Sequence, residues 1–279
     1  MKDNYPQISL SRFCRLLDVT RQAYYQHFWQ EEFIGIEQDL ILREVRSIRA
    51  RHRHMGVRKL YERLQPYFLE HQIKIGRDAL FDLLQANQLL VRRRKRRVFT
   101  TQSFHWLRKY PNLIKGYIPS QPNQLWVSDI TYWKIGSGYA YISLITDAFS
   151  HKIVGHHVAN SLGTIETLEA LKKATKALPD GHTGLRHHSD RGIQYCSSEY
   201  VQLLQQSNIQ ISMTETGDPR ENPIAERVNG ILKEEYLYDY QVQDIAQAKL
   251  VLDFVVELYN VERPHMSCNY KTPASIHEN

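Results

Sequence analysis

Three acidic residues come from three separate predicted elements, and their side chains are of the kind that hold divalent cations. Asp129 lies in the middle of the apolar segment 124–135, where a charged side chain is costly unless it is paired or bound to a metal. Asp190 lies at the tip of the short segment RHHSD, and Glu226 lies in the first turn of the predicted helix PIAERVNGILKEEYL. Hard divalent cations prefer carboxylate oxygens as ligands. Together the three acids predict a site for two Mg²⁺ or Mn²⁺ ions, whereas Asp190 alone would be interpreted as a turn residue.

Two divalent cations held roughly 3.5–4 Å apart catalyse in-line displacement at a phosphodiester, because one activates the attacking oxygen and the other stabilises the leaving oxygen. Such a site needs neither a histidine base nor a covalent nucleophile. The sequence agrees with this chemistry, since it contains no GxSxG motif, no Cys/His pair at useful spacing and no GxxxxGKS/T loop. The three acids therefore predict cleavage or transfer of a phosphodiester.

The helix that carries Glu226 predicts a second functional group on the same face. Lys233 follows Glu226 by seven residues, which is nearly two turns of an α-helix. The two side chains therefore share one face with Asn229 or Gly230. We expect Lys233 and Asn229 to contact DNA beside the metal site, together with Arg227 from the same helix.

The segments around the acids predict a mixed sheet, because three β-rich segments are followed by alternating helices and strands. The predicted elements, in order, are strands 124–135, 139–150 and 151–160, helix 164–178, strand 184–190, helix 197–208, strand 209–213 and helix 223–237. We expect Thr164 to cap the first of these helices and Asn222 to cap the last. Three antiparallel strands followed by βα units make a five-stranded sheet with helices on both faces. The predicted fold class is α/β with ribonuclease H-like topology, preceded by an all-α helix-turn-helix region.

Charge is unevenly distributed along the 279 residues. Residues 1–120 hold 23 Lys or Arg and 11 Asp or Glu, a balance of +12, whereas residues 121–279 hold 13 and 19, a balance of −6. A basic part of this kind is typical of a surface that binds a polyanion. It contains SLSRFCRLLDVTRQAYYQHF, in which Thr20 is expected to cap a second short helix. This segment is a helix-turn-helix candidate, with Arg21 and Gln22 on its DNA-facing side.

The rest of the basic part predicts a second DNA-binding region. A longer helix is expected over residues 33–53, and helices at 56–68 and 76–90 form another helix-turn-helix candidate that presents Arg77. The run VRRRKRRVF follows, and its basic residues are candidate phosphate contacts: Arg92, Arg93, Arg94, Lys95, Arg96 and Arg97. The expected domains are 1–55 and 56–99 for the two DNA-binding regions, 100–122 for a linker, 123–240 for the core, and 241–279 for a C-terminal helix and tail that complete it.

The order of the acids resembles that of the retroviral integrase superfamily, in which the last two acids are separated by 35 residues and a basic residue follows. More narrowly, the chain resembles the OrfB-type transposases of bacterial insertion sequences. The likeness covers most of the chain and is carried by PNQLWVSDITYW, HHSDRGIQYCS, ENPIAERVNGILKEE, YNVERPHMSCNYKTPA, GVRKLYERL and the arginine run. Many members of that family have Asp-Asn-Ala before the last helix, where this chain has Glu221-Asn222-Pro223. This difference leaves Glu221 as an alternative to Glu226.

The resemblance implies that Asp129, Asp190 and Glu226 are catalytic acids that bind two Mg²⁺ or Mn²⁺ ions, and that Lys233 contacts the element end. It implies recognition of terminal inverted repeats, followed by DNA strand cleavage and strand transfer. The implied partners are double-stranded DNA, further copies of the chain assembled on DNA, and an OrfA-type partner or fusion. Two alternatives stay open: a ribonuclease H-like metal nuclease, and a DNA-binding regulator with an inactive core.

Residues outside this pattern carry weaker signals. His188 is expected to lie near the metal site or to orient Asp190, and no further ligand pair has the spacing of a zinc motif. The three cysteines, Cys14, Cys196 and Cys268, fit neither a disulfide framework nor a metal motif, so we interpret them as incidental thiols in a reducing compartment. The sequence shows no bilayer-spanning apolar run and no signal peptide. These features predict a cytoplasmic, nucleoid-associated bacterial protein without a membrane partner.

Overall fold

The computed structural model describes residues 8–91, 106–136, 138–179, 181–216 and 219–278. The chain divides into two compact units. The helical unit is made of residues 1–50 and 63–90, and the sheet unit is made of residues 51–62 and 91–279. Among the described residues, no helix is both long enough and apolar enough to cross a bilayer.

Among residues 8–91 and 106–124, four helices precede the sheet, and most of their residues form the helical unit. Their bounds are α1 Leu10–Leu16, α2 Arg21–Arg51, α3 Val57–Glu70 and α4 Arg77–Ala86. Thr20 caps α2 as predicted, because its Oγ1 accepts a hydrogen bond of 3.0 Å from the amide of Ala23. The prediction of a separate helix from residue 33 is wrong, since α2 is continuous. The segment contains no proline, and Gly35 alone costs a helix only about 1 kcal/mol.

The sheet unit contains the predicted five-stranded mixed sheet, with strand order β3-β2-β1-β4-β5. The strands are β1 Leu125–Ile135, β2 Gly138–Asp147, β3 Ile153–Ala159, β4 Arg186–Ser189 and β5 Gln210–Met213. Strands β1, β2 and β3 are antiparallel neighbours, whereas β4 is parallel to both β1 and β5. This confirms the ribonuclease H-like topology and makes the strands that precede Asp190 and carry Asp129 direct neighbours.

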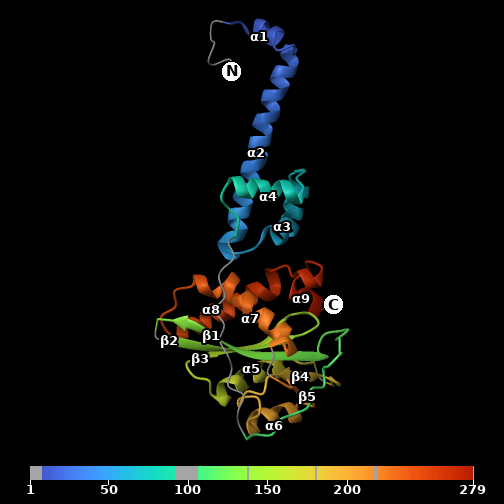
Figure 1. Ribbon diagram of the computed structural model, residues 1–279, viewed down its shortest axis with the longest axis vertical. Coiled ribbons are helices and arrows are strands. Elements are labelled where there is room, and N and C mark those ends of the chain that lie inside the picture. Colours follow the sequence, from blue (N-terminus) through green and yellow to red (C-terminus); the bar gives the residue numbers. More distant parts are fainter. Residues whose placement is uncertain (1–7, 92–105, 137, 180, 217–218, 279) are drawn as a thin grey trace. The chain divides into compact units, whose positions relative to one another are not determined.

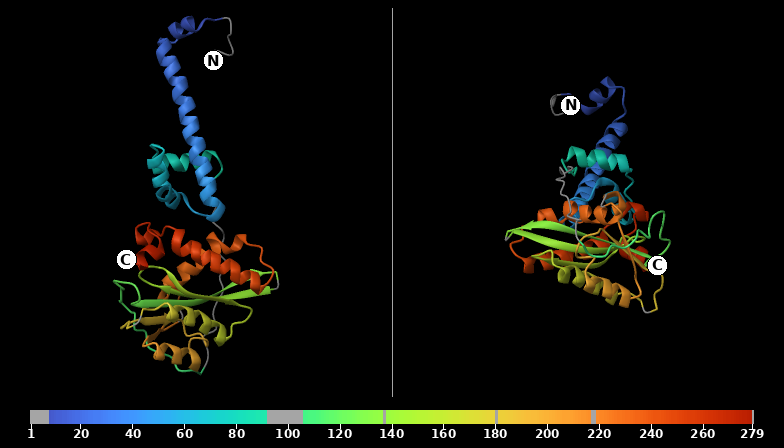
Figure 2. Two further views of the ribbon diagram at one scale, coloured as in Figure 1. Left: turned by 180° about the vertical axis from the view of Figure 1, so that it is seen from behind. Right: turned by 60° about the horizontal axis from the view of Figure 1, so that its bottom comes forward.

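Helices cover both faces of the sheet, as Figure 1 and the reverse view in Figure 2 show. Helices α5 and α6 lie on one face, and α7 and α8 lie on the other. The bounds are α5 Thr164–Lys176, α6 Ser198–Gln206, α7 Pro223–Glu235, α8 Ile245–Glu257 and α9 Pro273–His277, with short turns at η2 Pro219–Glu221, η3 Leu237–Asp239, η4 Leu258–Glu262 and η5 Met266–Cys268. Each face has its own apolar core.

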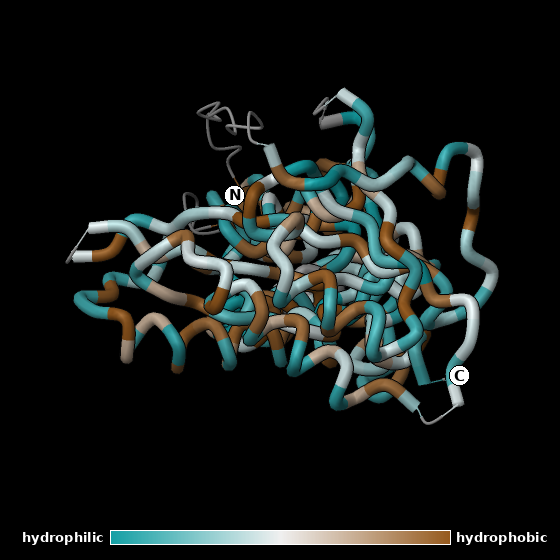
Figure 3. Tube along the Cα trace, turned by 90° about the horizontal axis from the view of Figure 1, so that it is seen from below, coloured by the Kyte–Doolittle hydropathy of each residue, from teal (hydrophilic) through white to brown (hydrophobic). Residues whose placement is uncertain are grey.

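Local sequence determines how these helices start and pack. The N-cap of α5 is Gly163 and not the predicted Thr164, which is the first helical residue. Asn222 is the N-cap of α7 as predicted, and Pro223 follows at the first helical position. In β3, a Cβ at Gly155 would lie 2.3 Å from the carbonyl oxygen of Ala170, so only glycine allows α5 to approach the sheet here. Hydrophobic and hydrophilic residues alternate along the trace of these elements (Figure 3), as expected for strands and helices with one buried face.

Candidate active site

The three predicted acids come from the central strand β1, the end of its parallel neighbour β4, and helix α7, which packs on β1 and β2. Asp129 lies on β1 and pairs with Leu144 of β2. Asp190 directly follows β4, which runs parallel to β1 with Val127 opposite His188. Glu226 lies in the first turn of α7 and is exposed. The charges of Asp190 and Glu226 both act on Asp129, so the fold brings the three acids into one electrostatic site.

Asp129 is held by two hydrogen bonds. The amide of Ile130 donates to Oδ1 at 2.9 Å, and the side-chain amide of Asn229 donates to Oδ2 at 2.7 Å. Asn229 is 4% exposed, so its side chain faces the sheet and not solvent. The prediction that Asn229 contacts DNA is therefore corrected, because this side chain is buried against the acid of β1.

Asp190 is held by the turn that follows β4. Its Oδ1 accepts a hydrogen bond of 2.9 Å from the amide of Gly192, which is buried. A Cβ at residue 192 would lie 2.9 Å from the same Oδ1, so the turn requires glycine to keep its amide close to the carboxylate. The sequence Asp-Arg-Gly thus builds a local support for the acid at the strand end.

Asn222 and His188 fix the start of α7 relative to the sheet. The side-chain amide of Asn222 donates to the backbone carbonyl of Ser128 at 2.8 Å. This hydrogen bond ties the start of α7 to the residue before Asp129. His188 is buried, with Nδ1 at 2.9 Å from Ser212 Oγ and Nε2 at 3.2 Å from the carbonyl oxygen of Glu221. The ring thus joins β4 to β5 and to the segment before α7, and we retain for it the proposed supporting role.

Glu221 is the weaker of the two rival acids. Its carboxylate accepts hydrogen bonds from the amides of Glu215 and Thr216 at 2.6 and 3.2 Å, and from the hydroxyl of Thr216 at 3.0 Å. A carboxylate that closes a turn in this way has few lone pairs left for a metal. Glu226 is therefore the better candidate for the third ligand.

Lys233 lies on the same face of α7 as Asn229, as the helical spacing predicted. Its ammonium donates to Thr131 Oγ1 at 2.7 Å and lies 5.2 Å from the ring centre of Tyr132. Asn229 and Lys233 thus reach two positions of β1 that lie on the same face of the sheet, Asp129 and Thr131. The ammonium of Lys233 is therefore placed beside the acids, because its partner Thr131 is two residues along β1 from Asp129.

The other predicted DNA contacts are spread over both units. Arg21 and Gln22 at the start of α2, Arg77 at the start of α4 and Arg227 on α7 are all exposed. The guanidinium of Arg77 donates to Asp78 at 3.1 Å, a surface pair that contributes little to stability. Six predicted contacts lie outside the described residues: Arg92, Arg93, Arg94, Lys95, Arg96 and Arg97.

The carboxyl group of Asp129 has an altered pKa. Burial is the largest cause, and the charges of Asp190 and Glu226 act in the same direction, so the pKa of Asp129 is raised to about 7. The hydrogen bonds from Asn229 and Ile130 oppose this rise but do not cancel it. Excess negative charge of this kind is what a divalent cation would neutralise.

The stability of the metal-free protein is expected to depend on pH, because the carboxyl group of Asp129 titrates differently in the folded and unfolded chain. Its folded pKa of about 7 lies above that of an unfolded aspartate. The stability contributed by its proton is therefore complete below about pH 4 and is lost as the pH rises through about 7. Asp129→Asn should raise the Tm of the metal-free protein, and the rise should be larger at pH 8 than at pH 5. Thermal unfolding in the presence of a chelator measures both values, and an equal shift at the two pH values would contradict the raised pKa.

Comparison with known proteins identifies the family of the chain. Residues 119–219 and 207–273 each match a family model described as an integrase core domain. The chain is 31% identical to an insertion element IS600 protein of 31 kDa from Shigella sonnei, over 95% of this chain and 97% of that protein. The chain belongs to the insertion-sequence transposases of the retroviral integrase superfamily.

Two further matches agree with this family. The transposase for insertion sequence element IS629 from Shigella sonnei is 28% identical over 96% of this chain and 91% of its own length. A solved simian T-cell lymphotropic virus intasome chain has a TM-score of 0.50 at 18% identity, covering 81% of this chain and 72% of that chain. The likeness to the viral protein supports the fold of this family member, whereas the bacterial relatives share its sequence along nearly the whole length.

Proposed function

We propose that this family member recognises the terminal inverted repeats of its insertion sequence and catalyses metal-dependent strand cleavage and strand transfer. The observation that carries the proposal is the convergence of Asp129, Asp190 and Glu226 from three elements, with the two other acids raising the pKa of Asp129. Phosphoryl transfer by two cations requires such a set of hard oxygen ligands. Membership in the transposase family supports DNA as the substrate.

The three carboxylates fit two Mg²⁺ or Mn²⁺ ions. All three offer oxygen ligands, and the raised pKa of Asp129 indicates that the group lacks a compensating positive charge. Asp129, Asp190 and Glu226 would hold the ions, which would activate the attacking oxygen and stabilise the leaving oxygen. The side-chain amide of Asn229 would keep the carboxylate of Asp129 in place, and the backbone amide of Gly192 would do the same for Asp190, since supporting hydrogen bonds orient metal ligands.

The reaction would proceed in two steps at the same site. Water would attack a phosphodiester at the element end and free a 3′-hydroxyl. That hydroxyl would then attack a phosphodiester of the target, so that one bond is broken for each bond made. Lys233 would leave Thr131 and hold a phosphate of the element end beside the acids, because an ammonium binds phosphate more strongly than a neutral hydroxyl.

DNA binding outside the core is assigned to the basic first part of the chain. We propose that the helix-turn-helix candidates within residues 1–55 and 56–99 bind the element end through Arg21, Gln22 and Arg77, with Arg227 and the run Arg92–Arg97 contacting phosphates. Two element ends must be joined, so several copies of the chain would assemble on DNA. An OrfA-type partner or fusion would add further DNA-binding helices.

The test incubates the full chain with Mg²⁺ or Mn²⁺ and a labelled duplex carrying the element end, with and without the OrfA-type product. We expect nicking at the end and then strand joining, which a duplex with a scrambled end does not support. Cleavage of RNA–DNA hybrids without end specificity would favour the nuclease alternative. Site-specific binding without cutting, even with the partner product present, would favour a regulator.

Lys233→Ala is expected to weaken binding of the element end about tenfold and to lower the slope of log affinity against log salt concentration by about one, because one phosphate contact is lost. Fluorescence anisotropy over a salt series measures both quantities. Lys249→Ala removes an exposed lysine of α8 and is the matched control. Equal affinity and slope in the two variants would show that Lys233 does not contact the DNA end.

A further inference from the structure

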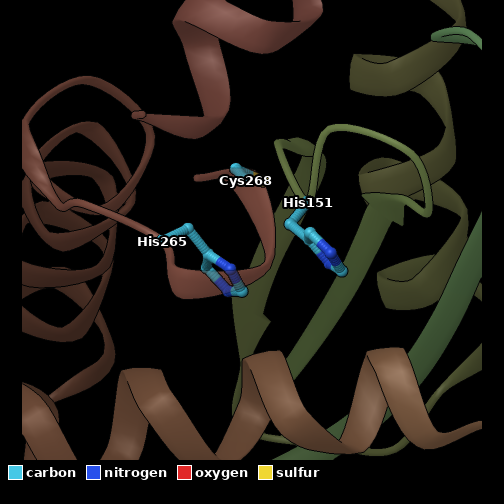
Figure 4. A group of neighbouring side chains, drawn as sticks. All are labelled: His151, His265 and Cys268. Atoms are coloured by element: carbon cyan, nitrogen blue, oxygen red, sulfur yellow. The ribbon is translucent and has the colours of Figure 1, made fainter. Parts of the chain in front are cut away.

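A group of nitrogen and sulfur ligands lies outside the acidic site, in the C-terminal part of the sheet unit. It consists of His151 from the turn between β2 and β3, and of His265 and Cys268 at the two ends of the turn that contains η5. One ligand atom of each residue lies within 4.8 Å of the other two. Figure 4 shows the two rings side by side, with Cys268 on the adjacent turn.

The ring of His265 contains a buried nitrogen without a partner. The residue is 7% exposed, and its Nε2 makes no hydrogen bond. Its other nitrogen, Nδ1, lies 2.7 Å from the hydroxyl oxygen of Ser267. A histidine that binds a metal commonly donates its second ring N–H to an oxygen, which fixes the tautomer and leaves the other lone pair for the metal. The contact with Ser267 matches this arrangement.

His151 is held close to His265 by the same serine and by its backbone. The two rings are stacked, with centres 4.5 Å apart and planes at 11°, and Nε2 of His151 lies 3.1 Å from Ser267 Oγ. A hydroxyl oxygen has two lone pairs, so Ser267 can accept from both rings and leave one lone pair free on each. His151 also adopts a φ of +60°, a conformation that is costly for a residue with a Cβ and is concentrated at functional sites.

The electrostatic surroundings leave both imidazoles neutral at pH 7. Burial, the neighbouring imidazole and cations that include Arg263 and Lys59 lower the pKa of His265 to about 3. Burial also lowers the pKa of His151. Arg263 and Lys59 are both paired with Glu235, at 2.8 and 2.7 Å, so one of their two positive charges is compensated.

We propose that His151, His265 and Cys268 bind a Zn²⁺ ion, with the fourth position taken by water. Two imidazoles and one thiolate suit a borderline-soft cation, whereas Mg²⁺ and Mn²⁺ prefer the oxygen ligands of the acidic site. Zinc–nitrogen and zinc–sulfur bonds of about 2.0–2.3 Å place the ligands of a tetrahedral site roughly 3.5 Å apart, so the side chains close by about 1 Å on binding. Because the lone pair of an imidazole lies in the plane of its ring, one of the two stacked rings must also turn so that both lone pairs point at the ion. The thiol of Cys268, which donates to the carbonyl of Ser150 at 3.6 Å, loses its proton to become the ligand.

This ion would fasten the C-terminal turn to the turn between β2 and β3. His151 is partly exposed, and Met266 and Ser267 are exposed, so the group lies near the surface of the sheet unit. The ion would therefore stabilise the fold, and its loss would not remove the acids that hold the catalytic metals.

Cobalt binding to the full chain tests the proposal, because Co²⁺ replaces Zn²⁺ and absorbs strongly when a thiolate is a ligand. With excess Mg²⁺ present, we expect this absorption in the wild-type protein and its displacement by one equivalent of Zn²⁺. Cys268→Ala and His151→Ala should remove the absorption and weaken Zn²⁺ binding about tenfold or more. Cys196→Ala is the matched control, since Cys196 and Cys268 are both 6% exposed.

The absorption reports only on the thiolate, so it does not depend on whether the acids catalyse transposition. Wild-type protein with a native circular dichroism spectrum and no cobalt–thiolate absorption would overturn the proposal. So would absorption of equal intensity in His151→Ala, which changes a partly exposed residue and tests the site even if Cys268→Ala fails to fold.

Discussion

Asp190→Asn and Glu226→Gln are each expected to lower end cleavage and strand joining on the order of a thousandfold or more, because each removes a charged ligand of the proposed cations. Both substitutions keep the shape of the side chain, and Glu226 is exposed, so the fold should be unaffected. Asp190→Asn also keeps an oxygen that can accept from the amide of Gly192. Binding of the element end should therefore remain close to wild type while the chemical steps are lost.

The measurement uses a labelled duplex with the element end and follows the nicked and joined products separately. Glu257→Gln is the matched control, because it neutralises an exposed glutamate of α8 away from the three acids. Loss of joining in Asp190→Asn together with normal activity in Glu226→Gln would show that another acid, such as Glu221, supplies the third ligand. Normal activity in both variants would remove the basis of the two-cation mechanism in this chain.

Glu235→Gln is expected to destabilise the sheet unit by about 3–5 kcal/mol, because it leaves the buried guanidinium of Arg263 without its counter-charge. Arg263 is 2% exposed, and its Nε and Nη2 each donate to the carboxylate of Glu235 at 2.8 Å. Lys59, from the start of α3 that belongs to the same unit, donates to Glu235 at 2.7 Å. Although burial opposes it, these two cations lower the pKa of Glu235 to about 2.

Urea denaturation at pH 7 measures the loss, and Glu199→Gln on the exposed side of α6 should change the free energy of unfolding by less than about 0.5 kcal/mol. The stabilisation by Glu235 is present above the usual pKa of a glutamate and is lost as the pH falls towards about 2, so the difference should shrink in acid. The double variant Glu235→Gln/Arg263→Met should recover part of the stability, since it removes the uncompensated charge. A loss below about 1 kcal/mol would mean that water or another group compensates Arg263.

Most of the helices and strands, and the choice of Asp129, Asp190 and Glu226 as candidate acids, follow from the order of residues along the chain. Period-two patterns identify strands and helical spacing places Glu226 and Lys233 on one face, because burial on one side imposes these periods on neighbouring residues. The same reasoning failed within α2, where a short helix after Thr20 and a longer helix from residue 33 were expected and one continuous helix forms. The prediction of the N-cap of α5 also failed. The N-cap is Gly163, which has no side chain to make a recognisable capping hydrogen bond.

The packing of the whole unit decides which side chains support the acids and which groups meet across the fold. Asn229 was assigned to DNA from its spacing, yet packing of α7 on β1 directs it to Asp129, 100 positions away. The pairing of Arg263 with Glu235 and the approach of His265 to His151 likewise join residues that no local pattern relates. A periodic pattern shows which face of an element is buried, but not which residue of another element lies against that face. That choice depends on how the helices dock on the twisted sheet, and it is settled only when the whole unit is packed.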